Sequence, residues 1–156
     1  IGHALVPLIE EATFFHTIAR KAQADFIVKG ANPFTESYSA IGPEVLEDAS
    51  GKQIARKNDN IIRLVEQFDA VIVAGQAKSH CVAWTVEDLL NEINLREPIL
   101  AQKVYLLDDC SSPVVVPGAM DYTDQAEAAY QRFAAAGMHR VLSTDLMENW
   151  PGMPST

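Results

Sequence analysis

The 156-residue sequence has little cysteine, no long hydrophobic run and no recognisable targeting segment. Its two cysteines, Cys81 and Cys110, lie far apart in the chain. They therefore form neither a disulfide framework nor a zinc-binding motif, and they are typical of reduced thiols in a cytoplasm. No apolar run approaches the length that spans a membrane, and no signal peptide is visible. The sequence predicts a cytoplasmic protein with no membrane partner.

Basic side chains are also scarce. Twelve Lys and Arg residues stand against 21 Asp and Glu residues, which gives a formal net charge of −9. A nucleic acid or an anionic membrane surface would repel such a chain, so neither is an expected partner. The hydrophobic fraction of 48% and the charged fraction of 21% are those of an ordinary globular protein. With no repeat, low-complexity tract or linker, residues 1–156 are expected to form a single domain.

Helical and strand patterns alternate along the chain, which is typical of an α/β protein with a mainly parallel sheet. Helices have apolar residues at a spacing of three and four, whereas the strands are short apolar runs that end at turn residues. The expected helices cover residues 5–22, 58–68, 82–94 and 121–136. The expected strands cover residues 25–28, 70–74, 104–107 and 139–143.

The stretch from Asp69 to Leu90 is the most informative part of the sequence. An apolar strand pattern ends at Gly75, a polar turn follows, and an amphipathic helix begins near Cys81. Such a unit delivers the turn to the carboxyl edge of a parallel sheet, where open α/β folds keep their sites. A thiol at the start of a helix meets unpaired N–H groups that favour thiolate, so Cys81 is a candidate nucleophile. From spacing alone, a small buried hydrophobe is an equally good interpretation.

Two blocks of sequence resemble those of a known family. The block Val73-Ala74-Gly75…Ser79-His80-Cys81-Val82…Thr85 is similar to the nucleophile segment of the isochorismatase-like cysteine hydrolases, the superfamily that includes the nicotinamidases. Upstream, the block Ile27-Val28-Lys29-Gly30-Ala31-Asn32-Pro33…Ser37-Tyr38-Ser39-Ala40 resembles the lysine segment of the same family. Two blocks in the right order are more specific than either alone, and a looser similarity extends over nearly the whole chain.

The resemblance implies a three-layer α/β/α, Rossmann-like fold and the hydrolysis of a C–N amide bond in a small molecule. Cys81 would attack the carbonyl carbon and form a thioester, while Lys29 would stabilise the thiolate. The resemblance also implies an oxyanion hole built from the backbone N–H groups of Ala77 and Cys81, with a cis peptide bond between Gln76 and Ala77.

Side chains around the expected active edge suggest how a substrate is held. Phe34 and Tyr38, on a long loop after the lysine segment, are candidates for the wall of a pocket for a planar ring, although either could simply be packing. His80 precedes the cysteine and is expected to have a pocket-lining or structural role. Cys110 lies in a turn without a Cys-x-x-Cys partner and is interpreted as structural.

The chain also departs from the family pattern. The first strand, whose last residue supplies a general-base Asp, and the Asp-x-His…His metal-ligand segment after the second strand have no counterpart here. We therefore expect a fold that lacks its first two strands, as the C-terminal portion of a longer chain. The base, and ligands for a divalent metal such as zinc, would come from the N-terminal segment, and this chain itself contributes no metal site. We expect a small-molecule amide substrate and a homo-oligomer.

The sequence is also compatible with other functions. Within the same superfamily the enzyme could be an isochorismatase-type hydrolase or a carbamoyl hydrolase. From a different class, the absent Asp and metal ligands favour a non-catalytic binding domain on the same scaffold. A redox role for Cys81 and Cys110 is a weaker alternative.

Overall fold

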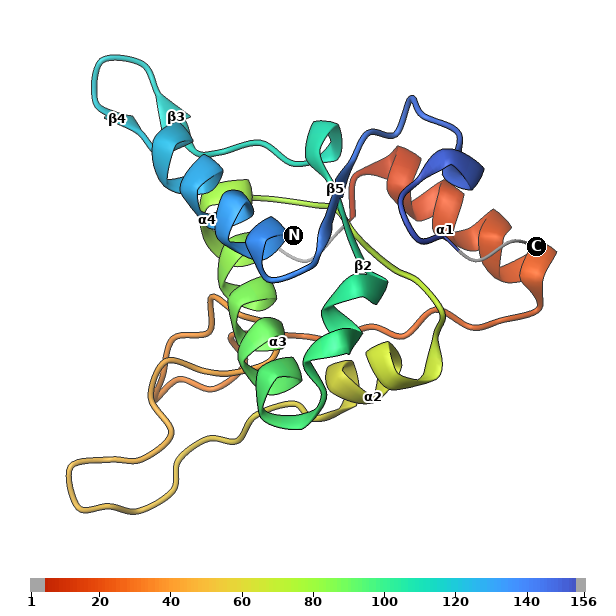
Figure 1. Ribbon diagram of the computed structural model, residues 1–156. Helices are drawn as coiled ribbons and strands as arrows, with labels where there is room; N and C mark the ends of the chain where they lie inside the picture. The colour runs from red at the N-terminus through yellow and green to blue at the C-terminus, as the bar shows by residue number, and fades with distance from the viewer. Residues whose placement is uncertain (1–4, 154–156) are drawn as a thin grey trace.

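The computed structural model describes residues 5–153. Helices and strands alternate over most of this range (Figure 1). The helices are α1 (Pro7–Arg20), α2 (Asn60–Gln67), α3 (Ala83–Arg96) and α4 (Thr123–Ala135). The strands are β1 (Val71–Val73), β2 (Val104–Leu107), β3 (Val115–Val116), β4 (Met120–Asp121) and β5 (His139–Val141). A π-helical turn (Lys78–Val82) leads into α3, and 3-10 turns cover Pro98–Lys103, Asp108–Cys110 and Met147–Asn149.

The main sheet has three parallel strands in the order β1-β2-β5. Val71 lies opposite Val104 in the first pair, and Tyr105 lies opposite His139 in the second. Because the strands are parallel, their carboxyl ends meet at one edge, where the turns after β1 and β2 also lie. The molecule is therefore an α/β protein with a mainly parallel sheet, as the sequence predicts. The sequence did not predict the short antiparallel hairpin β3–β4.

Alternation along the strands divides the sheet into two faces. On one face, Val104 and Leu106 are fully buried against α2, α3 and α4. On the other face, Tyr105 packs with Val141 and the indole of Trp150. Each of the three helices presents its predicted apolar side to the first face. The buried helical residues are Ile62 and Val65 of α2; Ala83, Val86, Leu89, Leu90 and Ile93 of α3; and Ala126, Ala129, Tyr130 and Phe133 of α4.

The strand predicted at residues 25–28 is wrong: this segment has no regular secondary structure. Phe26 and Val28 are 72% and 70% exposed. An isolated extended segment gains no ladder hydrogen bonds and buries no face, so an apolar pattern alone does not make it a strand. Among the described residues β1 pairs only with β2, and residues 25–28 do not pair with its other edge.

Helix α1 forms where the sequence predicts, but it buries none of its residues. Leu8, Phe14 and Phe15 are 75%, 60% and 59% exposed. The second helical layer of the expected three-layer α/β/α sandwich is therefore not built by residues 5–153. Instead, the C-terminal segment around Trp150 covers part of that face of the sheet.

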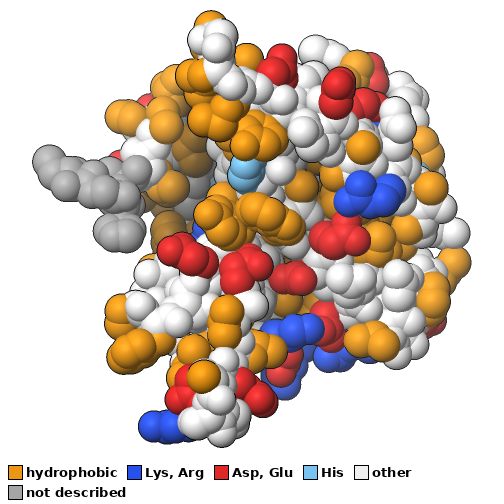
Figure 2. Space-filling view, turned by 90° about the vertical axis from the view of Figure 1, so that its left-hand side faces the viewer, with side chains coloured by type: hydrophobic (Ala, Val, Ile, Leu, Met, Phe, Trp, Pro, Cys, Tyr) orange, Lys and Arg blue, Asp and Glu red, His pale blue; other side chains and the backbone are white. Residues whose placement is uncertain are grey.

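The surface shown in Figure 2 mixes hydrophobic and acidic side chains over the side of the molecule that carries α3, α4 and the hairpin. None of the helices within residues 5–153 combines the length and the apolar character that crossing a membrane requires.

Candidate active site at the start of helix α3

The turn that carries Cys81 lies between β1 and α3, at the carboxyl edge of the sheet. Gly75 has a φ of +136°, a conformation that L side chains rarely adopt, which allows the chain to leave the strand sharply. The peptide bond between Gln76 and Ala77 is cis, the isomer that the resemblance implies. The carbonyl oxygen of Ala77 then accepts hydrogen bonds from the N–H groups of His80 (3.0 Å) and Val82 (3.2 Å). Cys81 is half-buried at the entrance to α3.

The loop after β2 holds this turn through three hydrogen bonds. The N–H of Gly75 donates to the carbonyl oxygen of Cys110 (3.2 Å), and the N–H of Lys78 donates to that of Ser112 (2.8 Å). In the opposite direction, the N–H of Val114 donates to the hydroxyl oxygen of Ser79 (3.0 Å). Although it is exposed, Cys110 thus contributes its backbone to the turn, which agrees with the structural interpretation.

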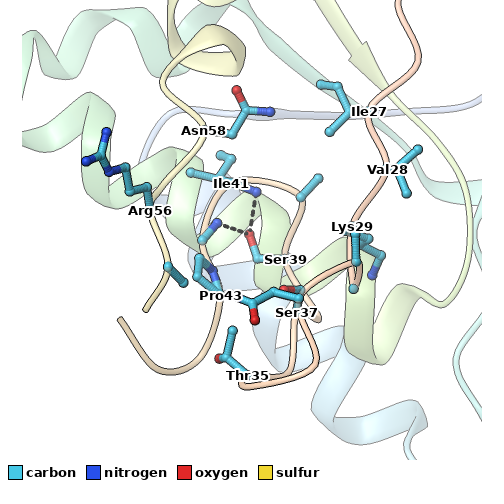
Figure 3. A pocket seen from close by; sticks show the side chains of 16 residues that line it. Ile27, Val28, Lys29, Thr35, Ser37, Ser39, Ile41, Pro43, Arg56 and Asn58 are labelled. Carbon is cyan, nitrogen blue, oxygen red and sulfur yellow. Dashed lines mark hydrogen bonds between the residues drawn. The ribbon is translucent and has the colours of Figure 1, made fainter. Parts of the chain in front are cut away.

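Lys29 lies at the end of the extended segment and points its ammonium group at its own loop. Its Nζ donates to the carbonyl oxygen of Tyr38 (2.5 Å). The side chain lines a hollow of about 270 Å³, with Arg56 and Asn58 on the opposite wall (Figure 3). In the same hollow, the hydroxyl oxygen of Ser39 accepts hydrogen bonds from the N–H groups of Ile41 and Gly42, at 3.0 and 3.3 Å.

Two contacts attach the loop bound by Lys29 to the first turn of α3. The ring of Tyr38 packs on that of Trp84, with centroids 4.5 Å apart. Two residues later, the N–H of Ala40 donates to the hydroxyl oxygen of Thr85 (3.0 Å), and that hydroxyl donates to the carbonyl oxygen of Cys81 (2.7 Å). The lysine segment and the cysteine turn are therefore neighbours through Tyr38 and Ala40.

These residues do not all line one cavity. The hollow beside Lys29 is not lined by Cys81, Phe34, Tyr38 or His80. Phe34 is 77% exposed and does not line this hollow, contrary to the predicted pocket wall. The structure therefore connects the predicted catalytic pair through the loop and α3, not through a shared pocket within residues 5–153.

His80 lines a separate hollow of about 630 Å³ between α3 and α4. The rings of Trp84 and Tyr122 pack edge-to-face on its imidazole, with centroids 5.6 and 4.7 Å away. The hydroxyl oxygen of Ser79, which accepts a hydrogen bond from the N–H of Val114, also lies 2.8 Å from the imidazole Nδ1 of His80. Sequence reasoning missed Trp84 and Tyr122; the spacing of four residues from His80 to Trp84 along a helix was the available signal.

The acidic side chains that follow β2 are already engaged. Burial raises the pKa of Asp108, but hydrogen bonds from Lys78 and Arg140 outweigh it and leave that pKa below its ordinary value. Hydrogen bonds from the hydroxyl and N–H of Ser143 lower the pKa of Asp109. Hydrogen-bond donors occupy both carboxylates and their lowered pKa values make them weak proton acceptors, so we assign neither as the general base.

Glu127 shares Arg140 with Asp108, and the hydrogen bonds from Arg140 and Gln131 lower its pKa from 4.5 to about 2. A carboxylate whose pKa is depressed by folding contributes stability above its unfolded pKa, and this contribution is lost as the pH falls towards the folded value. We therefore expect the urea concentration at the unfolding midpoint to decrease as the pH is lowered from about 4.5 to about 2. The decrease should be smaller in Glu127→Gln, which lacks this carboxylate.

The matched control is Glu66→Gln, which removes an exposed pair with Arg96 (3.0 Å) far from this network. It should retain the full acid-induced drop in urea midpoint. An identical drop in Glu127→Gln and the wild type would contradict the assignment of this acid sensitivity to Glu127.

The resemblance implies a zinc ion held by residues of an N-terminal segment. Within residues 5–153, no group of three or more His, Cys, Asp or Glu side chains could hold a metal ion. The described residues therefore do not fit a zinc site.

Comparison with known proteins gives one distant likeness. No family model and no curated protein sequence matches the chain. A solved nicotinamidase pyrazinamidase from Acinetobacter baumanii is similar over 71% of this chain, with 24% sequence identity and a TM-score of 0.43. The match spans 44% of the length of that protein.

Proposed function

We propose that the protein is a cysteine hydrolase that cleaves the C–N amide bond of a small molecule. The observation that carries the proposal is the position of Cys81. It is half-buried at the start of α3, on a turn at the carboxyl edge of a parallel sheet, and the loop bound by Lys29 packs on the same helical turn. The two sequence blocks that resemble the isochorismatase-like hydrolases contain these two residues.

In the proposed reaction, the sulfur of Cys81 attacks the amide carbonyl carbon and forms a C–S bond. The C–N bond then breaks, ammonia leaves with the thiol proton, and the acyl group remains on sulfur as a thioester. Water cleaves the thioester to release the carboxylic acid and restore the thiol. The backbone N–H groups of Ala77 and Cys81 are the proposed donors to the oxyanion, and Lys29 stabilises the thiolate.

A general base is still required to move these protons. Lys78 and Arg140 bind Asp108, and Ser143 binds Asp109. We therefore propose that the general base comes from outside residues 5–153. The N-terminal segment expected from the sequence resemblance is the proposed source. Activity tests therefore belong in the complete gene product.

Replacing Lys29 with methionine is expected to lower kcat/KM for amide hydrolysis by about 100-fold or more, because the uncharged side chain no longer stabilises the thiolate. Ammonia release from a panel of small carboxamides, with and without an aromatic ring, measures the effect. Lys52→Met, a change on the following exposed loop, is the control and should retain wild-type kinetics. Equal activity of Lys29→Met and the wild type would remove Lys29 from the mechanism.

One observation favours a second candidate, a non-catalytic binding domain: Cys81 does not line the hollow beside Lys29. This candidate predicts that the complete protein binds a small molecule but turns over none of the amide panel. The hydrolase proposal predicts ammonia release from at least one member. An isochorismatase-type or carbamoyl hydrolase would be recognised in the same assay by turnover of a vinyl ether or a carbamoyl compound instead.

A further inference from the structure

The turn that carries Cys81 contains a buried lysine that the proposed reaction does not use. Lys78 is only 9% exposed, although it lies on a surface turn three residues before Cys81. Its ammonium forms an ion pair with Asp108 at the carboxyl end of β2, and it lies 4.3 Å from the centroid of the Tyr130 ring. Lysine is almost never buried without a partner, so this inward orientation depends on Asp108 and Tyr130.

A second cation, Arg140, also binds Asp108. The Nε and Nη2 of Arg140 donate to its Oδ2, at 3.0 and 2.5 Å. The same guanidinium donates to both carboxylate oxygens of Glu127, at 2.6 and 2.9 Å. Two cations and two carboxylates thus connect the turn, β2, β5 and α4. Charge within the network is balanced, which is what a partly buried group of ions requires.

We infer that Lys78 is a positioning residue that holds the Cys81 turn in its reactive geometry, an inference that rests on the proposed function. Lys78 lies between Ala77 and Cys81, the two proposed oxyanion donors. Its backbone N–H is bound to Ser112 (2.8 Å) while its side chain is bound to Asp108, so the residue is held at both ends. Losing the side-chain anchor frees the turn without touching a substrate contact, and therefore affects the transition state more than substrate binding.

The test uses the complete protein with Cys110→Ser, so that Cys81 is its only thiol within residues 1–156. Lys78→Met keeps an unbranched side chain only one atom shorter and removes the charge. We expect kcat for amide hydrolysis to fall about tenfold or more with KM within about threefold, and alkylation of Cys81 by iodoacetamide to slow about fivefold. Lys78→Arg should recover most of both rates, since it restores the ion pair.

Lys57→Met is the matched control. Lys57 pairs with Glu92 on α3 at 2.8 Å, but the Lys57 side chain is 44% exposed and Glu92 lies 11 residues after Cys81, so both rates should be unchanged. Circular dichroism of each variant at the assay temperature establishes that it is folded. If Lys78→Met does not fold, Asp108→Asn replaces it, because the amide keeps the shape of Asp108 but removes the charge that pairs with Lys78; the same two losses are then expected.

A folded Lys78→Met or Asp108→Asn protein with kcat and alkylation rate within about twofold of the wild type would overturn the inference. The alkylation assay needs no substrate. Slower alkylation in a protein that hydrolyses no amide would therefore support the role of Lys78 and reject the proposed function, so the two failures are distinguishable.

Discussion

Replacing Cys81 with alanine is expected to lower amide hydrolysis by the complete protein about 1,000-fold or more, because the variant has no nucleophile to form the thioester. The fold should survive the change. Cys81 is half-buried and lies outside the two hydrophobic clusters, whereas its neighbours Val82 and Ala83 are buried in the larger one. We expect the free energy of unfolding to change by no more than about 1 kcal/mol. Ammonia release and urea unfolding measure the two effects.

The control is Cys110→Ser. Its sulfur is exposed, and the structural contribution of the residue is the carbonyl oxygen that accepts from Gly75, which serine retains. Turnover should therefore match that of the wild type. Unchanged amide turnover in Cys81→Ala would reject the nucleophile assignment. Retained activity on a vinyl ether such as isochorismate would instead identify the alternative reaction, which does not need the cysteine.

Ile93→Ala is expected to destabilise the protein by about 2–5 kcal/mol. Ile93 is 0% exposed on α3, in the cluster that also contains Val104 and Leu106 of β2. Removing three of its carbons loses buried apolar area and leaves a cavity in a close-packed layer. The loss matters for function because the buried face of α3 sets the position of the cysteine turn above the sheet. Urea unfolding followed by circular dichroism measures the change.

Leu95→Ala is the matched control, two residues further along the same helix. Leu95 is 80% exposed, so its truncation should change the free energy of unfolding by less than about 0.5 kcal/mol. Similar losses for the two variants would mean that α3 is rotated relative to the sheet, and the position of Cys81 would then be wrong as well.

Local sequence patterns were sufficient to predict many of the helices and strands. The apolar runs around Val71 and Val104 and the helical spacing of Val86, Leu89 and Ile93 each correspond to an observed element. They succeed because each side chain has a partner within the described residues. The run at residues 25–28 fails for the opposite reason: a strand is defined by the strand beside it, and residues 25–28 pair with no strand among the described residues. In the same way, the apolar stripe of α1 predicts its helix but not a surface to pack against.

The candidate site was less predictable. The sequence places Cys81 on a turn and Lys29 after an extended segment, but the contacts between them depend on Tyr38 and Trp84, which are 46 residues apart in the chain. The ion pair of Lys78 joins residues 30 positions apart, and that of Arg140 with Asp108 joins residues 32 apart. Such pairings arise only when the strands align, and no spacing rule within one element reveals them.

The most direct test of the central claim is peptide mass spectrometry of the complete protein, quenched with acid during turnover of an amide substrate. The account predicts that the peptide containing Cys81 gains the mass of the acyl group, and that hydroxylamine removes it, as it does from a thioester. Turnover of the amide with no acyl group on Cys81, in a protein whose Cys81→Ala variant remains active, would contradict the account.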